Sequence, residues 1–238
     1  MRKNLFFLLA ALVAWAGVPA AAGAQSGDFY LTPKLGVSYF SSKNHTYGNG
    51  DPTDYAYRGG NARFAGALAI GYDFSGTGAP LRTELEYTIR SARETDHDFT
   101  FTGTNDRFRV GHKLKADTLM ANLYYDFEND SVATPYIGAG LGLAFVKGEN
   151  NFGVIRPNND YVHIADGSDH SRKFAWNAAA GVAWDITDSL SLDLGYRYFN
   201  INKASAGPIN TDVFNLGQSE AKNMNLHEVM LGLRISYY

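Results

Sequence analysis

The sequence contains no cysteine, which excludes a disulfide scaffold and any metal site built from thiolates. A strong excess of one charge is also missing, since 21 basic residues stand against 24 acidic ones and the net charge is −3. This balance argues against nucleic acid as a partner. After residue 24 there is no apolar run of about 18 residues, the length that a transmembrane helix needs. The sequence therefore predicts no such helix in residues 25–238.

The N-terminus has the three parts of a secretory signal peptide. Arg2 and Lys3 provide positive charge, residues 5–18 form an apolar run, and Ala22-Gly-Ala24 supplies small residues for cleavage. A retained anchor helix is the alternative, but the apolar run is too short to favour it. We expect residues 1–24 to be removed, Gln25 to begin the mature chain, and residues 25–238 to form one domain.

Glycine and aromatic residues are abundant, with 25 Gly, 15 Tyr and 15 Phe, which favours an all-β protein. Near the C-terminus, Val229, Leu231 and Leu233 alternate with Met230 and Gly232. Successive side chains of a strand point to opposite faces, so this segment is a strand with one apolar face. The same alternation occurs in eight segments: residues 31–39, 67–74, 81–90, 118–127, 136–145, 174–185, 190–199 and 225–238.

The second face of these strands decides the kind of barrel. It carries mostly Gly and Ala with a few charged residues, as in residues 136–144. Small side chains fit a narrow lumen and would make a poor solvent-facing surface, so we expect the apolar face to contact lipid. A soluble barrel of the lipocalin type, apolar inside and polar outside, is the disfavoured alternative.

The connections between the strands alternate in length. Short turns are expected at residues 75–80, 128–134 and 187–189, and long polar loops at 41–63, 91–112, 147–172 and 200–222. This is the arrangement of outer-membrane barrels, with periplasmic turns and extracellular loops. The sequence predicts an eight-stranded antiparallel transmembrane up-and-down β-barrel with both termini in the periplasm. Aromatic residues near both ends of the strands, such as Tyr72, Tyr125, Phe174 and Tyr196, are expected to form two girdles.

Several strands resemble the opacity-type porin and surface-antigen family of eight-stranded outer-membrane barrels. The resembling stretches are residues 81–87, 119–127, 134–143, 174–185, 190–198 and 231–235. The resemblance implies the bacterial outer membrane and a role in adhesion, host or surface interaction, or nominal porin activity. Barrels of this kind usually end on an outward-facing aromatic residue that the assembly machinery recognises; here Tyr237 is followed by one more residue, Tyr238.

Charged residues on the lumen face form the first candidate site. These residues, here called the charge belt, are Lys34, Arg82, Glu84, Glu86, Asp193, Arg197 and Arg234. Buried charges need partners, so we expect Glu84 and Glu86 to face Lys34, Arg197 and Arg234. The belt could act as a gate or selectivity filter, or as a structural plug. The plug is favoured, because an eight-stranded barrel is filled by its own side chains.

Basic residues where the strands meet the long loops form the second candidate site. These residues, here called the basic rim, are Arg63, Arg93, Lys113, Lys115, Lys147, Arg172 and Lys173. Acidic residues gather instead at the turns, for example Asp73 and Asp126. Since the outer leaflet presents phosphorylated lipopolysaccharide, the rim is a candidate phosphate-binding surface. Ordinary solvated loop charges are the equally weighted alternative.

Other candidates for chemistry are weaker. The third long loop contains acidic and imidazole groups that could hold a divalent cation, but their spacing matches no known motif and a solvated loop is favoured. These residues are Asp160, His163, Asp166, Asp169 and His170. His227, on the outward face of the last strand, has no serine or acidic partner at a recognisable spacing. We therefore expect no enzyme activity and no cofactor.

Two functions remain open from the sequence. The first is a plugged barrel whose polar loops contact a host ligand, another surface or lipopolysaccharide. The second is a small-solute porin with a narrow charged channel. The loops match no binding motif, so their ligand is not identified.

The signal-peptide assignment gives a first testable prediction. Intact mass and N-terminal sequencing of protein extracted from outer membranes should show a chain that begins at Gln25. A chain that still carries residues 1–24 would instead support the anchor helix.

Overall fold

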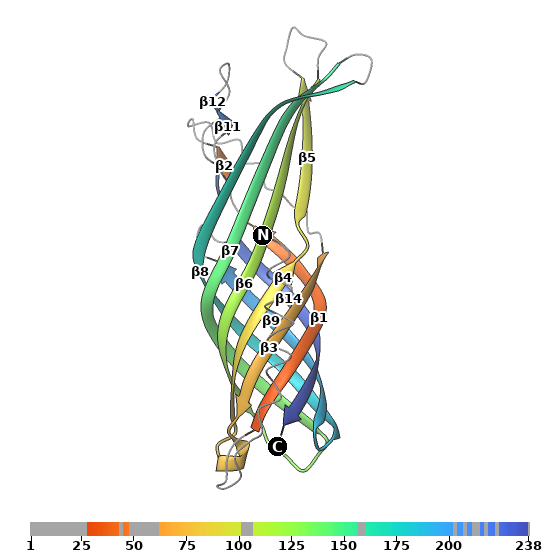
Figure 1. Ribbon diagram of the computed structural model, residues 1–238, viewed down its shortest axis with the longest axis vertical. Helices are drawn as coiled ribbons and strands as arrows, with labels where there is room; N and C mark the ends of the chain where they lie inside the picture. The colour runs from red at the N-terminus through yellow and green to blue at the C-terminus, as the bar shows by residue number, and fades with distance from the viewer. Residues whose placement is uncertain are drawn as a thin grey trace.

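The computed structural model describes residues 28–42, 45–47, 62–100, 107–156, 160–201, 204–206, 209–210, 215–216, 219–221 and 224–237. Eight of its strands form a barrel (Figure 1). They are β1 (Asp28–Ser42), β3 (Ala62–Asp73), β4 (Leu81–Arg90), β6 (Arg107–Asp126), β7 (Ala133–Ile155), β8 (Tyr161–Thr187), β9 (Leu190–Ile201) and β14 (Met224–Tyr237). The predicted signal peptide lies outside the described residues.

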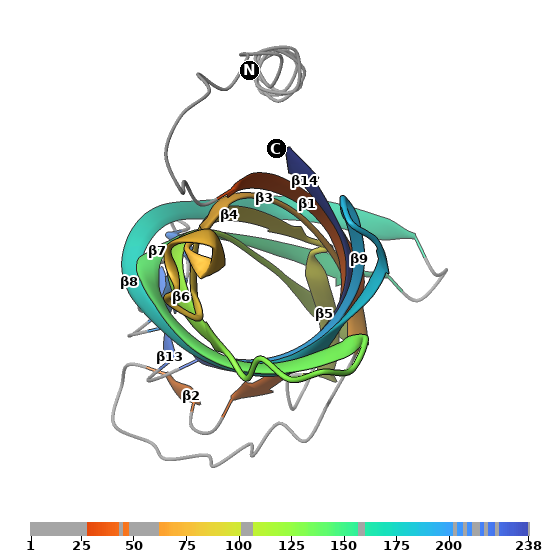
Figure 2. The ribbon, with the colours of Figure 1, turned by 90° about the horizontal axis from the view of Figure 1, so that it is seen from below.

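The barrel is closed by one pairing between strands distant in sequence. These are the first and last strands, β1 and β14, whereas β4 and β6 are consecutive strands of the wall and pair from Leu81↔Tyr125 to Thr88↔Thr118. All pairings are antiparallel, and the order around the wall is β4-β3-β1-β14-β9-β8-β7-β6. Figure 2 shows the resulting ring. The predicted eight-stranded up-and-down barrel is confirmed.

The side chains are arranged with polar groups inside and apolar groups outside. On β4, Arg82 and Glu86 are buried at 1% and 0% exposure, whereas Leu85 between them is 52% exposed. Leu35 and Leu141 on other strands are 60% and 61% exposed. This arrangement is that of a barrel whose outer surface meets lipid, and it excludes the lipocalin-like alternative.

The two ends of the barrel differ as predicted. At one end the strands are joined by short connections, such as residues 74–80, which contain a 3₁₀ turn (Ser75–Thr77). Gly78 follows it with a φ of 81°, which residues with a side chain rarely adopt. The long connections lie at the opposite end (Figure 1). Among the described residues, no helix is long and apolar enough to cross a membrane.

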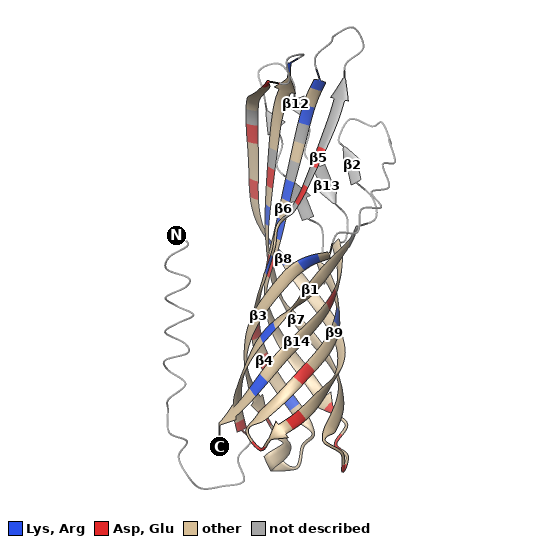
Figure 3. Cartoon of the chain, turned by 90° about the vertical axis from the view of Figure 1, so that its right-hand side faces the viewer, with Lys and Arg blue, Asp and Glu red and all other residues tan. Residues whose placement is uncertain are grey.

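Two of the long connections contain regular structure that the sequence analysis did not predict. Residues 91–112 and 147–172 largely continue as strands: β7 has 23 residues, β8 has 27, and β5 (Arg93–Thr100) pairs with the upper part of β6. Together they form a sheet above one side of the barrel, here called the extension (Figure 3). Most of its exposed side chains are polar, but Phe152 and Ile155 are buried, and the ring of Phe152 stacks on that of Phe108 at 5.9 Å. The regular apolar alternation of the barrel strands therefore ends below, although the backbone ladder continues.

The other two long connections lie partly outside the described residues. Their described parts contain short strands: β2 (His45–Tyr47), β10 (Ala204–Ala206), β11 (Ile209–Asn210), β12 (Asn215–Leu216) and β13 (Ser219–Ala221). β13 pairs with both β2 and β10. The first and last loops are therefore held together above the barrel.

Candidate functional site

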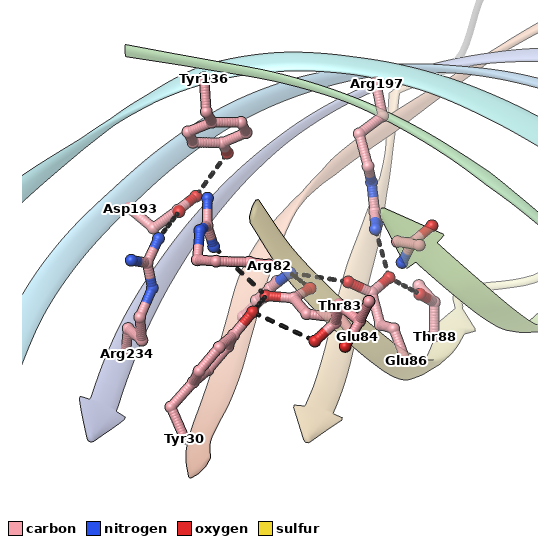
Figure 4. A network of polar contacts seen from close by, with 12 residues as sticks. Tyr30, Arg82, Thr83, Glu84, Glu86, Thr88, Tyr136, Asp193, Arg197 and Arg234 are labelled. Carbon is pink, nitrogen blue, oxygen red and sulfur yellow. Dashed lines mark hydrogen bonds and ion pairs between the residues drawn. The ribbon is translucent and has the colours of Figure 1, made fainter. Parts of the chain in front are cut away.

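The turn-side part of the lumen contains an arginine surrounded by tyrosine rings (Figure 4). Arg82 of β4 forms an ion pair with Asp126 of β6, and its guanidinium lies 5.0 Å from the ring centre of Tyr124 and 5.1 Å from that of Tyr136. The Tyr136 hydroxyl donates to Asp193 Oδ1 at 2.7 Å. The planar cation is thus held by a carboxylate and by aromatic faces.

Above it, a lysine bridges two glutamates. Lys34 Nζ donates to Glu84 Oε2 at 2.7 Å and to Glu86 Oε2 at 2.9 Å. Arg197 forms an ion pair with the other oxygen of Glu86, which also accepts a hydrogen bond from the Thr88 hydroxyl at 2.7 Å. Glu86 is therefore fully buried and paired with cations from β1 and β9.

Glu228 of β14 extends the chain of charges toward the loops. It accepts a hydrogen bond from Arg90 Nε at 2.5 Å and from Arg197 Nη2 at 3.0 Å. The result is an alternating sequence of buried charges across four strands, Glu84–Lys34–Glu86–Arg197–Glu228–Arg90. The sequence analysis did not place Glu228 in the belt, although it lies on the lumen phase of its strand and opposite Arg197 in the β9–β14 register.

All seven predicted belt residues lie on the lumen side, but one expected pairing is wrong. Arg234 pairs with Asp193 at 3.1 Å and not with Glu84 or Glu86. The reason is the register of β14 and β9. Gly232 stands directly opposite Asp193, which makes Arg234 its diagonal neighbour, whereas both glutamates belong to β4.

The loop-side part of the lumen is apolar, which the sequence analysis also missed. Ten buried side chains form this apolar layer: Phe40, Ala116, Met120, Ala144, Val146, Ala175, Phe199, Ile201, Met224 and Leu226. The guanidinium groups of Arg90 and Arg197 lie 5.0 Å and 5.1 Å from the ring centre of Phe199. The layer therefore rests directly on the upper end of the charge belt. The sequence contains a sign of this layer: near the long loops, apolar residues occupy the lumen-facing positions of the strands as well as the lipid-facing ones.

The basic rim divides into two groups by strand phase. Lys113, Lys115, Lys147 and Arg172 lie on the outer phase of β6, β7 and β8. Arg63 and Lys173 lie on the lumen phase, because each is next to an outward-facing residue, Phe64 and Phe174 respectively. Both basic side chains are half-buried. The side chain of Arg93 lies outside the described part of the structure. The basic rim thus has members on both faces of the wall, and its binding of phosphate stays a prediction.

Three rim lysines have acidic neighbours. Lys113 pairs with Glu94 at 2.8 Å, Lys115 with Asp117 at 2.8 Å, and Lys147 with Glu149. Hydrogen bonds from Lys113 and Lys147 lower the pKa values of Glu94 and Glu149, respectively. These carboxylates therefore remain ionised at neutral pH.

The remaining candidates are dispersed. Asp160, His163, Asp166, Asp169 and His170 are spread along β8 and just before it, and His163 Nε2 lies 3.1 Å from Asp166 Oδ2. In the described part of the chain, no three acidic or imidazole groups come together as a metal site would require. His227 Nδ1 is hydrogen-bonded to the Tyr196 hydroxyl at 2.7 Å on the outer face.

A sequence profile described as "Outer membrane protein beta-barrel domain" matches residues 7–219. The chain belongs to this family. It is 36% identical over 224 residues to the outer membrane protein PagN of Salmonella typhimurium, a match covering 85% of this chain and 86% of PagN. It is 24% identical to a Rickettsia canadensis protein with the provisional name adhesin, with 87% of each chain covered.

Among solved structures, Neisserial surface protein A is similar at 20% identity and a TM-score of 0.48, with 88% of this chain and 97% of that chain covered. The family assignment places the protein in the bacterial outer membrane, and the lipid-facing surface described above agrees with it.

The buried belt gives a second prediction. Glu228→Gln removes the carboxylate partner of Arg90 and leaves Arg197 with Glu86 alone. Breaking a buried ion pair in this way costs about 3–5 kcal/mol. Urea unfolding of the barrel reconstituted in lipid vesicles should show a loss of that order. Glu149→Gln, in an exposed pair of the extension, is the control and should change little. Equal losses for the two variants would contradict a special role of the belt.

Proposed function

We propose that the chain is a non-conducting outer-membrane barrel that holds an extracellular sheet for contact with surfaces outside the cell. The observation that carries this proposal is the two-part filling of the lumen. In the charge belt, the cations and carboxylates neutralise each other, so they attract solute ions only weakly. In the apolar layer, the side chains exclude the water that ions need for passage. Solutes entering from either end would meet one part and then the other.

The glycines of the lumen wall support closure and do not widen the barrel. A Cβ at Gly138 would lie 2.3 Å from the ring of Tyr124, and one at Gly140 would lie 2.0 Å from the side-chain oxygen of Asn122. Both distances are far below contact, so the space that these glycines leave is already filled by larger side chains of β6. This observation disfavours the small-solute porin.

The surface role is supported by the extension and by the relatives. The extension raises charged and polar side chains of β6, β7 and β8 well above the barrel (Figure 3). Related rickettsial proteins carry the provisional name adhesin. We infer a binding protein for a host or other surface ligand, without enzyme activity and without a cofactor.

The topology in the envelope follows from the same geometry. Asp28 and Tyr237 lie at the turn end, next to the connection between β8 and β9. We therefore propose that both termini of the mature domain, residues 25–238, are periplasmic. Tyr237 is exposed on the outer face and is the residue that we expect the assembly machinery to recognise.

Conductance of single molecules in planar lipid bilayers tests the closed lumen. The purified protein should give no steady unit current. Folding is verified separately by the heat-dependent change in electrophoretic mobility that folded barrels show, and insertion by recovery of the protein with the lipid after flotation of vesicles, so that silence is neither a failure to fold nor a failure to insert. A reproducible unit current would overturn the plug and establish the porin.

Shortening of the extension tests the surface role. Residues 150–167 can be replaced by a two-residue Asn-Gly turn, because the flanking residues Glu149 and Ser168 are directly opposite in the β7–β8 register. Bacteria that display this variant should lose attachment to cultured host cells, while the barrel keeps its heat-dependent mobility. Replacement of the short connection 128–132 by a glycine-rich segment is the control. Unchanged attachment of the shortened variant would remove the extension from the proposal.

A further inference from the structure

Three basic side chains meet on the outer face where β6, β7 and β8 rise above the barrel. Lys115 and Lys147 are directly opposite each other, and Arg172 is opposite Phe145, two residues before Lys147. Neighbours in these positions have Cβ atoms about 5 Å apart when opposite and about 7–8 Å apart on the diagonal. Like charges directly opposite on a sheet destabilise it. This place therefore contains a repulsion that a bound anion would relieve.

The acidic neighbours do not remove this excess of positive charge. Among the described residues, Arg172 has no ion-pair partner, and Lys115 and Lys147 each have one carboxylate on their own strand. Both carboxylates have a second donor nearby: Asp117 also accepts from the backbone N–H of Arg90 at 3.1 Å, and Glu149 stands opposite Lys113. The two lysines can therefore turn to a ligand without leaving a carboxylate unpaired.

The three bases lie just above the lipid-facing surface. Leu143 and Phe174 are opposite each other on β7 and β8, point outward, and are 45% and 49% exposed. Lys147 is four residues farther along β7, which is about 13 Å along the strand or about 10 Å in height at a tilt of ~40°. This height is where lipid head groups begin above the hydrocarbon region.

We propose that Lys115, Lys147 and Arg172 form a binding site for a phosphate group of lipopolysaccharide in the surrounding outer leaflet. Arginine offers two parallel donors to a phosphate and lysine offers a mobile point charge, so the set suits a phosphate oxygen cluster. Phe145 and Phe174, directly below, contact the acyl chains of the same molecule. The inference rests on the proposed orientation of the barrel and is independent of its adhesive role.

The charges higher on the extension favour a membrane lipid over a soluble anion. Four residues beyond the two lysines, the same face carries the row Asp96, Gly111, Asn151 and Asp166. Both aspartates are exposed. An anion that approaches from solution meets these carboxylates first, whereas a lipid phosphate reaches the bases from the side, within the plane of the membrane.

The test compares binding of lipid A to the purified barrel in detergent micelles. The probes are bis-phosphorylated lipid A, the same lipid A with its phosphates removed enzymatically, phosphatidylglycerol and inorganic phosphate. The variant combines Lys115→Gln, Lys147→Gln and Arg172→Gln, all on the outer face and away from the lumen. Loss of three charge-assisted contacts should weaken binding of bis-phosphorylated lipid A at least 10-fold, which corresponds to about 1.4 kcal/mol or more.

A control variant with the same change in charge separates the site from general electrostatics. It combines Arg107→Gln, Arg109→Gln and Arg156→Gln, on β6 and just after β7, farther from the membrane. Its affinity should stay within about twofold of the wild type, because the removed charges lie outside the site. Dephosphorylated lipid A should bind the wild type as weakly as intact lipid A binds the triple variant.

Four results would overturn the proposal: wild-type affinity in the triple variant, an equal loss in the control, equal binding of dephosphorylated lipid A, or equally tight binding of phosphatidylglycerol or inorganic phosphate. The last would show a general anion site and not one for lipopolysaccharide. None of these results bears on conductance or on cell attachment, so failure here is distinguishable from failure of the proposed function.

Discussion

Closure of the sheet on itself, by the pairing of the first strand β1 with the last strand β14, is the constraint on which the rest of the structure depends. In a membrane, each backbone N–H and C=O group needs a partner within the protein, and only a sheet closed on itself supplies one for every strand. With eight strands, closure leaves an interior just wide enough for side chains. Long charged side chains that point inward from β4 therefore meet those of β1, β9 and β14 across the lumen.

Closure also explains why the charges alternate so strictly. Each ion in the lumen has lost its water and would be costly without a partner of opposite sign. Glu86 has two cations and Arg197 has two carboxylates, so most members of the chain are compensated on both sides. The apolar layer above seals this chain from the loop side, while Arg90 and Arg197 contact it through the ring of Phe199. The belt and the layer are thus one filled interior with two chemistries.

The sequence was sufficient to predict what depends on strand phase. Period-two alternation identified the eight strands, the lipid-facing surface and the lumen position of Lys34 and Glu86, because a side chain's face is fixed by its place in its own strand. Partners across the lumen depend on how the strands are staggered, which no single strand encodes. Arg234 was therefore assigned to the wrong carboxylate, and Glu228 was missed although its own phase was known.

The upper parts of β6, β7 and β8 were missed for a related reason. Lipid on one side and a lumen on the other create the alternation, and above the membrane both faces meet water. There the ladder continues through backbone hydrogen bonds, with an apolar contact between Phe108 and Phe152, and a mostly polar sequence without regular alternation resembles a loop. For the same reason the sequence analysis placed Arg63 and Lys173 in one group with the outward-facing bases. Near water a charged residue is tolerated on either face of a strand, so its charge does not reveal its direction.

Because the extension is a continuation of barrel strands, its side chains stand at fixed positions relative to the membrane. A slip of one residue between β6 and β7 would turn Lys115 or Lys147 from the outer face to the lumen side. Such a slip is prevented below, where it would also move Met120 from the apolar layer into lipid and Leu119 into the lumen. The packed interior thus fixes the register, and the register holds the outward-facing bases just above the lipid and the tip of the extension far from it.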